Sequence, residues 1–369
     1  MRVLSLTILL LLCTTFAYAD ESKTDTRPSI APDIREDESK LKQQKGNFVA
    51  VPIPISNPTL GTGLVAGAAY FYKQTEEQKK VQPASVTGAG GLYTDNDSKA
   101  FAIGHQGYWS KNRWRVTSAI GAADLRLSLL SADQTPGGRN VDWRIKGGFL
   151  FAKLSRKLAG HWYGGLNLRV VDADQTFEPS EASLEFDLGS HVRSAGIGAS
   201  AEYDARDMPM NTYSGRYFKV DALFNDESLG SDKTYQSYSL AYRSYHELTD
   251  SLVLAWEVQG CKRGGTTPLW DACMIKLRGF SVTDYLGTET ASGQVEARLR
   301  FNDRWGLFGF AGSGYVGNPF SYVRDQNPVP SYCAGVRFMV LKANRIKLRI
   351  DYARSEDSDA IHVAVGEAF

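Results

Sequence analysis

Arg278 stands out among the side chains that could position another group. It lies in residues 275–280 (IKLRGF), within a long polar segment between two strand-like runs. A guanidinium stays charged at physiological pH and can form a bidentate pair with a carboxylate. Glu296 and Asp351 are candidate partners, because each lies on the charged side of an alternating run. Such a pair would pin the segment, and the alternative is a loop arginine that faces solvent.

The residue types needed for enzymatic chemistry are present but not grouped. None of the five histidines, at positions 105, 161, 191, 246 and 362, has the spacing of a metal ligand set. No Gly-x-Ser-x-Gly motif marks a nucleophilic serine. Gly-Gly pairs recur, but none is followed by the Lys-Ser/Thr of a phosphate-binding loop. We therefore expect a protein that is not an enzyme, with no metal and no cofactor.

Several segments alternate apolar and polar residues with the period of a β-strand. The clearest are residues 218–224, 252–259, 295–301 and 346–353. A soluble sandwich would alternate in the same way, but abundant Gly and aromatic residues without long apolar runs are typical of a membrane barrel. We predict an all-β fold, a transmembrane antiparallel β-barrel of about sixteen strands. Five of them follow Phe280, and the charged side of each strand faces a wet lumen.

Composition excludes other classes. The 369 residues carry a net charge of +1 and no basic block, which argues against a nucleic-acid partner. The mean hydropathy of −0.30 is too low for a helical membrane protein. Arg2, the apolar core at 4–12 and Ala17-Tyr18-Ala19 predict a secretory signal peptide over 1–19. The charged segment 20–46 reads as a flexible periplasmic leader, and the barrel domain is expected over 47–369.

Cysteine usage fits an oxidising compartment. Cys261 and Cys273 bracket the segment before Arg278, and Cys333 lies alone in a strand-like run. We predict a disulfide between Cys261 and Cys273 within one extracellular loop. The alternative is a pair of free thiols, because loop geometry cannot be read from the sequence.

Four stretches resemble the BamA/TamA-type outer-membrane barrels of the bacterial surface antigen superfamily. They are Asn57–Leu64, residues 203–217, Leu277-Arg278-Gly279-Phe280, and residues 346–369 with the terminal aromatic Phe369. The resemblance implies that the motif loop folds into the barrel and that Arg278 sits in the lumen. In that family an acid in an FxDxG motif often pairs with the arginine. Phe310 occupies that place here, which leaves Glu296 or Asp351 as the partner.

The resemblance also implies a function. Family members insert or translocate proteins at the outer membrane without ATP or cofactor, so the implied partners are membrane lipids and client proteins. This chain has no room for the periplasmic POTRA domains of well-known members, and a separate periplasmic partner would have to replace them. The alternative is a passive pore or a structural surface antigen at the bacterial outer membrane.

The first and last strands should form the weakest seam of the barrel. We place the first strand from Asn57 to about Lys73, where small residues offer few stabilising cross-strand pairs. The residues predicted at this seam are Gly61, Gly63, Gly67, Gly366 and Phe369. We expect the seam to open laterally. The alternative is a permanently closed wall in which these small residues make room for the infolded loop.

Overall fold

The structure is a computed structural model of the whole chain. It describes residues 47–57, 60–79, 81–130, 141–179, 190–207, 211–280, 283, 285–319, 328–341, 346–355, 359–365, 367 and 369. The predicted signal peptide and leader, together with Gly366, lie outside these residues. No helix in the described part of the chain is long and apolar enough to cross a membrane.

The described residues form sixteen long strands and one two-residue strand, β12 (Cys273–Met274). The long strands are β1 (Asn47–Asn57), β2 (Gly61–Phe71), β3 (Val86–Thr94), β4 (Lys99–Trp109), β5 (Trp114–Leu130), β6 (Val141–Ala159), β7 (Trp162–Pro179), β8 (Ser190–Asp204), β9 (Gly215–Asn225), β10 (Tyr235–Thr249), β11 (Leu252–Gly265), β13 (Leu286–Arg300), β14 (Trp305–Pro319), β15 (Val329–Leu341), β16 (Ile346–Ser355) and β17 (Asp359–Val365). The helical segments are α3 (Glu76–Lys79), η2 (Glu227–Leu229) and η3 (Leu269–Asp271).

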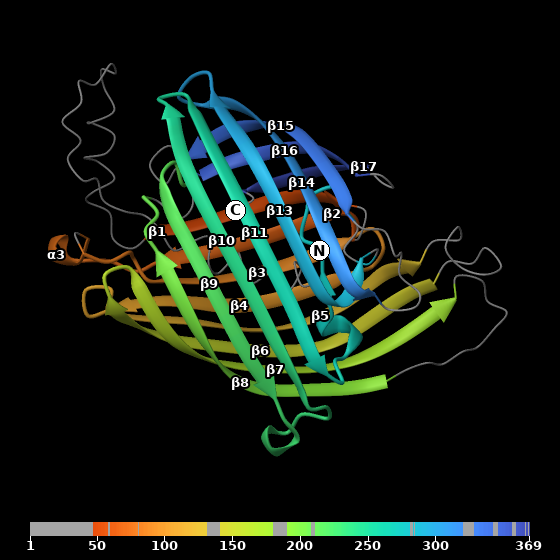
Figure 1. Cartoon of the computed structure of the whole chain (residues 1–369). Helices are drawn as coiled ribbons and strands as arrows, with labels where there is room; N and C mark the ends of the chain where they lie inside the picture. The colour runs from red at the N-terminus through yellow and green to blue at the C-terminus, as the bar shows by residue number, and fades with distance from the viewer. Residues whose placement is uncertain are drawn as a thin grey trace.

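Each long strand pairs antiparallel with its neighbour in sequence, and β11 pairs directly with β13. Figure 1 shows the strands winding into one barrel. The short β12, in the connection between β11 and β13, pairs with the first residues of β13. The predicted sixteen-strand barrel is confirmed, as are the five strands after Phe280. The alternating pattern explains why these segments form a barrel wall, because each strand can bury one face and expose the other.

The exposed face is apolar and the enclosed face is polar. On β13, Val295 and Leu299 point outward, whereas Glu296 and Arg298 are almost completely enclosed. A belt of exposed tryptophans lies at one rim, at the strand ends that precede or follow the short turns: Trp109, Trp114, Trp162 and Trp305. Amphipathic aromatic rings favour a membrane–water interface. The surface therefore has the apolar band and aromatic rim of a membrane barrel.

The prediction that the first strand runs from Asn57 to about Lys73 was wrong. A full strand, β1, precedes Gly61 and pairs with β2 over its whole length, from Asn47 opposite Phe71 to Asn57 opposite Gly61. β2 also pairs with β3. Gly61, Gly63 and Gly67 therefore lie in or at the end of an interior wall strand rather than at the seam. Two prolines in residues 47–57 obscured this strand, because proline is confined to edge strands and bulges.

The seam lies between β1 and β17. These two strands lie next to each other, but the described residues show no paired register between them, whereas every other pair of adjacent wall strands has one. Phe369 does not line this seam. Its ring is buried inside the barrel against Tyr245 of β10 and Ala255 of β11.

Candidate functional site

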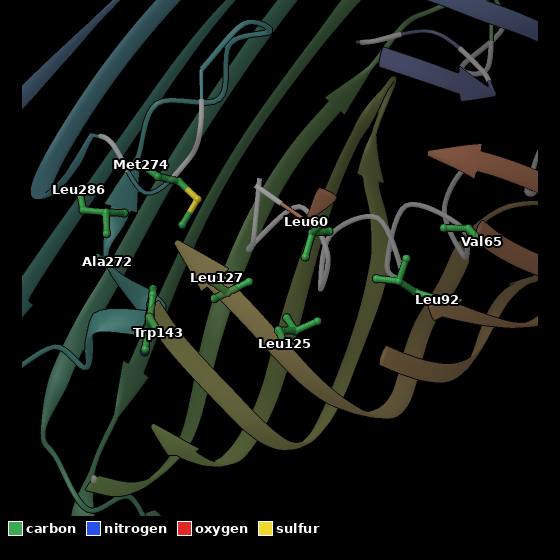
Figure 2. Close-up of a cluster of buried hydrophobic side chains, with 9 residues drawn as sticks. All are labelled: Leu60, Val65, Leu92, Leu125, Leu127, Trp143, Ala272, Met274 and Leu286. Atoms are coloured by element: carbon green, nitrogen blue, oxygen red, sulfur yellow. The ribbon is translucent and has the colours of Figure 1, made fainter. Parts of the chain in front are cut away.

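The connection between β11 and β13 folds back into the barrel. Ala272 and Met274 belong to one buried apolar cluster with wall residues such as Leu127 of β5 and Trp143 of β6 (Figure 2). A second cluster joins loop and wall residues further along: Ile275, Leu277, Phe280, Tyr285, Val316 and Val329. A polar loop with apolar residues at these positions buries them by entering the lumen. We call residues 266–280, together with Thr283 and Tyr285, the infolded loop.

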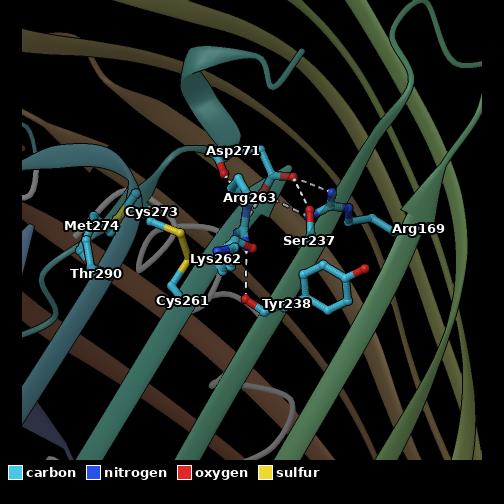
Figure 3. Close-up of a disulfide and its surroundings, with 10 residues drawn as sticks. All are labelled: Arg169, Ser237, Tyr238, Cys261, Lys262, Arg263, Asp271, Cys273, Met274 and Thr290. Atoms are coloured by element: carbon cyan, nitrogen blue, oxygen red, sulfur yellow. Dashed lines mark hydrogen bonds and ion pairs between the residues drawn. A yellow bond between two sulfur atoms is a disulfide. The ribbon is translucent and has the colours of Figure 1, made fainter. Parts of the chain in front are cut away.

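A disulfide ties the infolded loop to the wall. Cys261 and Cys273 are bonded, with their Cα atoms 5.7 Å apart, a separation that suits a disulfide. Cys261 does not lie in an extracellular loop as expected, because β11 continues through it to Gly265. Cys273 begins β12, which pairs with β13. The bond therefore joins a wall strand to the start of the segment that carries Arg278 (Figure 3).

Asp271 forms a second anchor that sequence analysis missed. Its carboxylate accepts two hydrogen bonds from Arg169 of β7, at 2.5 and 3.0 Å, and a third from Arg263 of β11 at 3.2 Å. The Ser237 hydroxyl donates to it at 3.1 Å (Figure 3). Burial alone would raise the pKa of Asp271, but the two guanidiniums outweigh burial and hold the pKa well below its usual value. This anchor fastens the loop to three wall strands, β7, β10 and β11.

Arg278 lies between the two predicted acids. Its Nη2 is 2.5 Å from Glu296 Oε2 on β13, and its Nη1 is 3.6 Å from Asp351 Oδ2 on β16. Both carboxylates are fully enclosed. Phe310, which stands where the family pattern has an acid, places its ring 4.0 Å from the Arg278 guanidinium carbon. A cation–π contact thus occupies the position of the missing ion pair.

Glu296 holds more cations than Arg278 alone. Arg298 Nε lies 2.7 Å from Glu296 Oε1, and Arg337 of β15 also bonds that oxygen. Arg349 pairs with Asp351 at 2.9 Å. We call these four arginines and two acids the Arg278 cluster. Arg298, Arg337 and Arg349 each occupy an inward position of an alternating strand. This pattern was visible in the sequence, but it indicated only which side of each strand faces the lumen.

The main chain of the motif is fastened as firmly as its side chain. The Ser331 hydroxyl donates to the Arg278 carbonyl, and the Ser355 hydroxyl donates to the Gly279 carbonyl at 3.0 Å. Gly279 has φ +91°, and a Cβ there would lie 3.1 Å from the main chain of Arg354. Only glycine fits both restrictions. Gly279 is therefore fixed by its main-chain contacts, while Leu277 and Phe280 on either side are buried in the apolar cluster described above.

Lys276 is the one loop cation for which the described residues show no ion pair. Burial lowers the pKa of Lys276 to about 8, and the nearby charge of Arg263 adds to the shift. A lysine whose pKa is lower in the folded state destabilises that state below this pKa. Stability should therefore increase as pH rises from about 8 to about 10.5, where the unfolded lysine also loses its proton.

Replacing Lys276 by methionine should stabilise the protein at pH 7, because it removes the ammonium and keeps the unbranched stem. Urea midpoints at pH 7.0 and 9.5 measure the effect, and the gain of the wild type between the two pH values should disappear in Lys276→Met. Lys262→Met is the matched control, since Lys262 is exposed and pairs with Glu289. An equal pH response in wild type and Lys276→Met would show that Lys276 is not the source.

The side chains that could bind a metal ion are spread out in the part of the chain that the structure describes. No cluster of three or more His, Cys, Asp or Glu side chains is placed to hold a metal ion there. His362 lies opposite Asp351 in the β16–β17 register, and His105 contacts Thr87. The free cysteine of the described residues, Cys333, is buried beside Phe308 and Phe310. Among the enclosed ion pairs, those of Asp271 and Arg278 involve the infolded loop.

No protein-family profile matches this sequence, and no curated protein matches it. Solved structures do match. BamA from Haemophilus ducreyi lacking POTRA domains 1–3 aligns with a TM-score of 0.63 at 11% identity, over 88% of this chain and 70% of that one. CdiB from Acinetobacter baumannii gives 0.57 at 12% identity, over 88% and 60%. CdiB from Escherichia coli gives 0.56 at 10% identity, over 86% and 61%.

The described chain spans about three fifths of the length of the two CdiB chains. At these identities the likeness concerns the fold. It agrees with the barrel architecture that the Leu277–Phe280 motif suggested, and the expectation of a BamA/TamA-type barrel is confirmed at that level. This chain is a sixteen-strand barrel with the fold of the BamA and CdiB outer-membrane proteins.

Proposed function

We propose that this protein resides in the bacterial outer membrane and assists the insertion or translocation of other proteins through the seam between β1 and β17. The observation that supports the proposal most is the seam itself. Every other adjacent pair of wall strands has a paired register in the described residues, and β1 and β17 do not. A sheet edge with unpaired main-chain groups is a template for another strand.

Opening this seam would let a client strand add to the barrel by main-chain hydrogen bonding, a process known as β-augmentation. The reaction needs no cofactor, because the hydrogen bonds and the burial of apolar surface supply the driving force. The infolded loop, held by its disulfide and two charged anchors, stiffens the wall formed by β11 to β16. Movement is then concentrated at the seam. The implied partners are outer-membrane lipids, client proteins and a periplasmic protein that delivers them.

The decisive experiment is to lock the seam. Cysteines at Ala50 and Ile361, both outward-facing, and at neighbouring positions on β1 and β17 would identify a pair that forms a disulfide. Proteoliposomes containing the locked barrel should lose assisted insertion of an unfolded outer-membrane protein, and reductant should restore it. The matched control joins Ile103 to Ile120, an exposed pair within the interior wall, and should leave insertion unchanged.

A passive pore or a structural surface antigen is the competing outcome. Unassisted and assisted insertion rates would then be equal with or without the lock. Planar-bilayer recording on the same samples separates these two alternatives, because a pore conducts in the locked state and a structural antigen does not conduct.

A further inference from the structure

The edge of β1 that faces the seam contains two prolines. Pro52 and Pro54 lie two residues apart in the middle of β1, and both are exposed. In the β1–β2 ladder they stand opposite Ala66 and Leu64. Proline has no N–H and cannot donate to a ladder. The consequence of these residues depends on which edge of β1 their main-chain groups face.

Contacts at both ends of β2 settle this direction. The Thr62 carbonyl accepts from the Asp95 N–H at 2.8 Å, and the Thr62 N–H donates to the Asp95 carboxylate at 3.0 Å. At the other end the Tyr72 N–H donates to the Ser85 carbonyl at 2.9 Å. Residues 62 and 72 therefore turn their main-chain groups toward the β3 side. The β2–β3 register is uninterrupted from Gly63 to Phe71.

In an antiparallel strand, alternate residues direct both N–H and C=O to the same neighbour. Leu64 and Ala66 share the parity of residue 62 and so face β3. In the β1–β2 ladder they therefore form non-hydrogen-bonded pairs with Pro54 and Pro52. The main-chain groups of these two prolines must face the other edge of β1. The main-chain nitrogen and carbonyl of Pro54 and of Pro52 thus face β17. Prolines are tolerated in a paired strand at such positions, because no ladder donor toward the established partner is lost.

The two edges of the seam are consequently unequal. β1 has lost two adjacent seam-facing donors, and prolines are among the residues that block strand addition at a sheet edge. β17, residues 359–365, contains no proline and keeps every N–H. We propose that β1 is a blocked edge, that this block keeps the seam unpaired, and that an extended polypeptide entering the seam pairs with β17. The last clause rests on the proposed function; the block itself does not.

Restoring the two donors tests the block. In Pro52→Val/Pro54→Val, the new amides can bond to β17, and amide exchange across residues 359–365 should slow by about tenfold or more. Ala50→Val is the matched control, since it adds a β-branched side chain on the same face without adding a donor. Hydrogen–deuterium exchange of the full barrel in lipid nanodiscs measures both. Unchanged β17 exchange, with the new valine amides exchanging as fast as unpaired ones, would overturn the block.

A strand probe tests the choice of edge. The probe is a synthetic peptide copying β2, residues 61–71, with cysteine in place of Ala66. It should form a disulfide with Ile361→Cys on β17 several-fold faster than with Ala50→Cys on β1. In the Pro52→Val/Pro54→Val background the preference should disappear. Equal rates in the proline-containing barrel, or no disulfide with either cysteine, would overturn the proposed pairing with β17.

These measurements are separate from the insertion assay. If wild-type barrel fails to accelerate insertion of a client in proteoliposomes, the proposed function fails, while the exchange and peptide results still report the state of the two edges. If insertion is accelerated but the peptide pairs preferentially with β1, the function stands and the edge assignment fails.

Discussion

Glu296→Gln should destabilise the barrel more than any other single replacement of a polar side chain in the described residues. The carboxylate is fully enclosed and contacts Arg278, Arg298 and Arg337. Glutamine keeps the shape and removes the charge, so three guanidiniums lose their common counter-ion. Removing one partner of a buried pair costs about 3 to 5 kcal/mol, and the polar lumen places the expected loss at about 3 kcal/mol. Urea unfolding in detergent micelles, followed by intrinsic tryptophan fluorescence, measures it.

The matched control lies on the same strand. Glu289 pairs with Lys262 at 2.7 Å, but both side chains are exposed, and such pairs contribute little. Glu289→Gln should leave the urea midpoint unchanged. A second readout identifies the mechanism: Glu296→Gln should also increase protease cleavage near Gly279, because Arg278 retains only the more distant Asp351. Equal midpoints for the two variants would show that the Arg278 cluster does not hold the barrel together.

Asp271→Asn should release the first half of the infolded loop. Asparagine retains the size of aspartate but loses the charge that Arg169 and Arg263 share. Hydrogen bonds to charged groups contribute about 1.5 to 3 kcal/mol, and we expect a loss of about 2 kcal/mol near neutral pH. Amide exchange over residues 266–272 should rise, whereas residues 277–280 remain protected by the disulfide at Cys273 and by Arg278.

The effect of Asp271→Asn should depend on pH in a defined direction. The folded-state pKa of Asp271 lies below its usual value, so its contribution is fully present above an unfolded pKa of about 3.9 and is lost as pH falls through the folded pKa. The two proteins should therefore converge in stability as pH falls below about 4. Asp97→Asn is the control, because the Asp97–Arg126 pair is exposed. A difference that stays constant down to pH 2 would contradict the assignment.

Local pattern was sufficient to predict the wall of the barrel. The alternation of Val295 and Leu299 with Glu296 and Arg298 depends only on the two-residue period of a strand, and each strand obeys it independently of its neighbours. The same parity selected Glu296 and Asp351 as inward acids, whereas the entry of Arg278 into the lumen was expected from the resemblance of its motif to BamA/TamA-type barrels. Cys261 and Cys273, twelve residues apart, were close enough in sequence to suggest a bond.

The anchors were not predictable, because they join residues that only the closed barrel brings together. Arg169 and Asp271 are 102 residues apart, and no local pattern relates a residue of β7 to a residue of the infolded loop. Arg337 reaches Glu296 from two strands away in the same manner. The shared counter-ion is therefore a property of barrel closure and strand register.

The seam required the tertiary structure most of all. The first strand was placed one strand too late, because proline within a run weakens the strand signal and residues 47–57 contain Pro52 and Pro54. An edge strand tolerates proline only where the missing N–H faces away from its paired neighbour. Whether β1 has such an edge depends on the gap beside β17, which forms only when all sixteen strands have closed around the lumen.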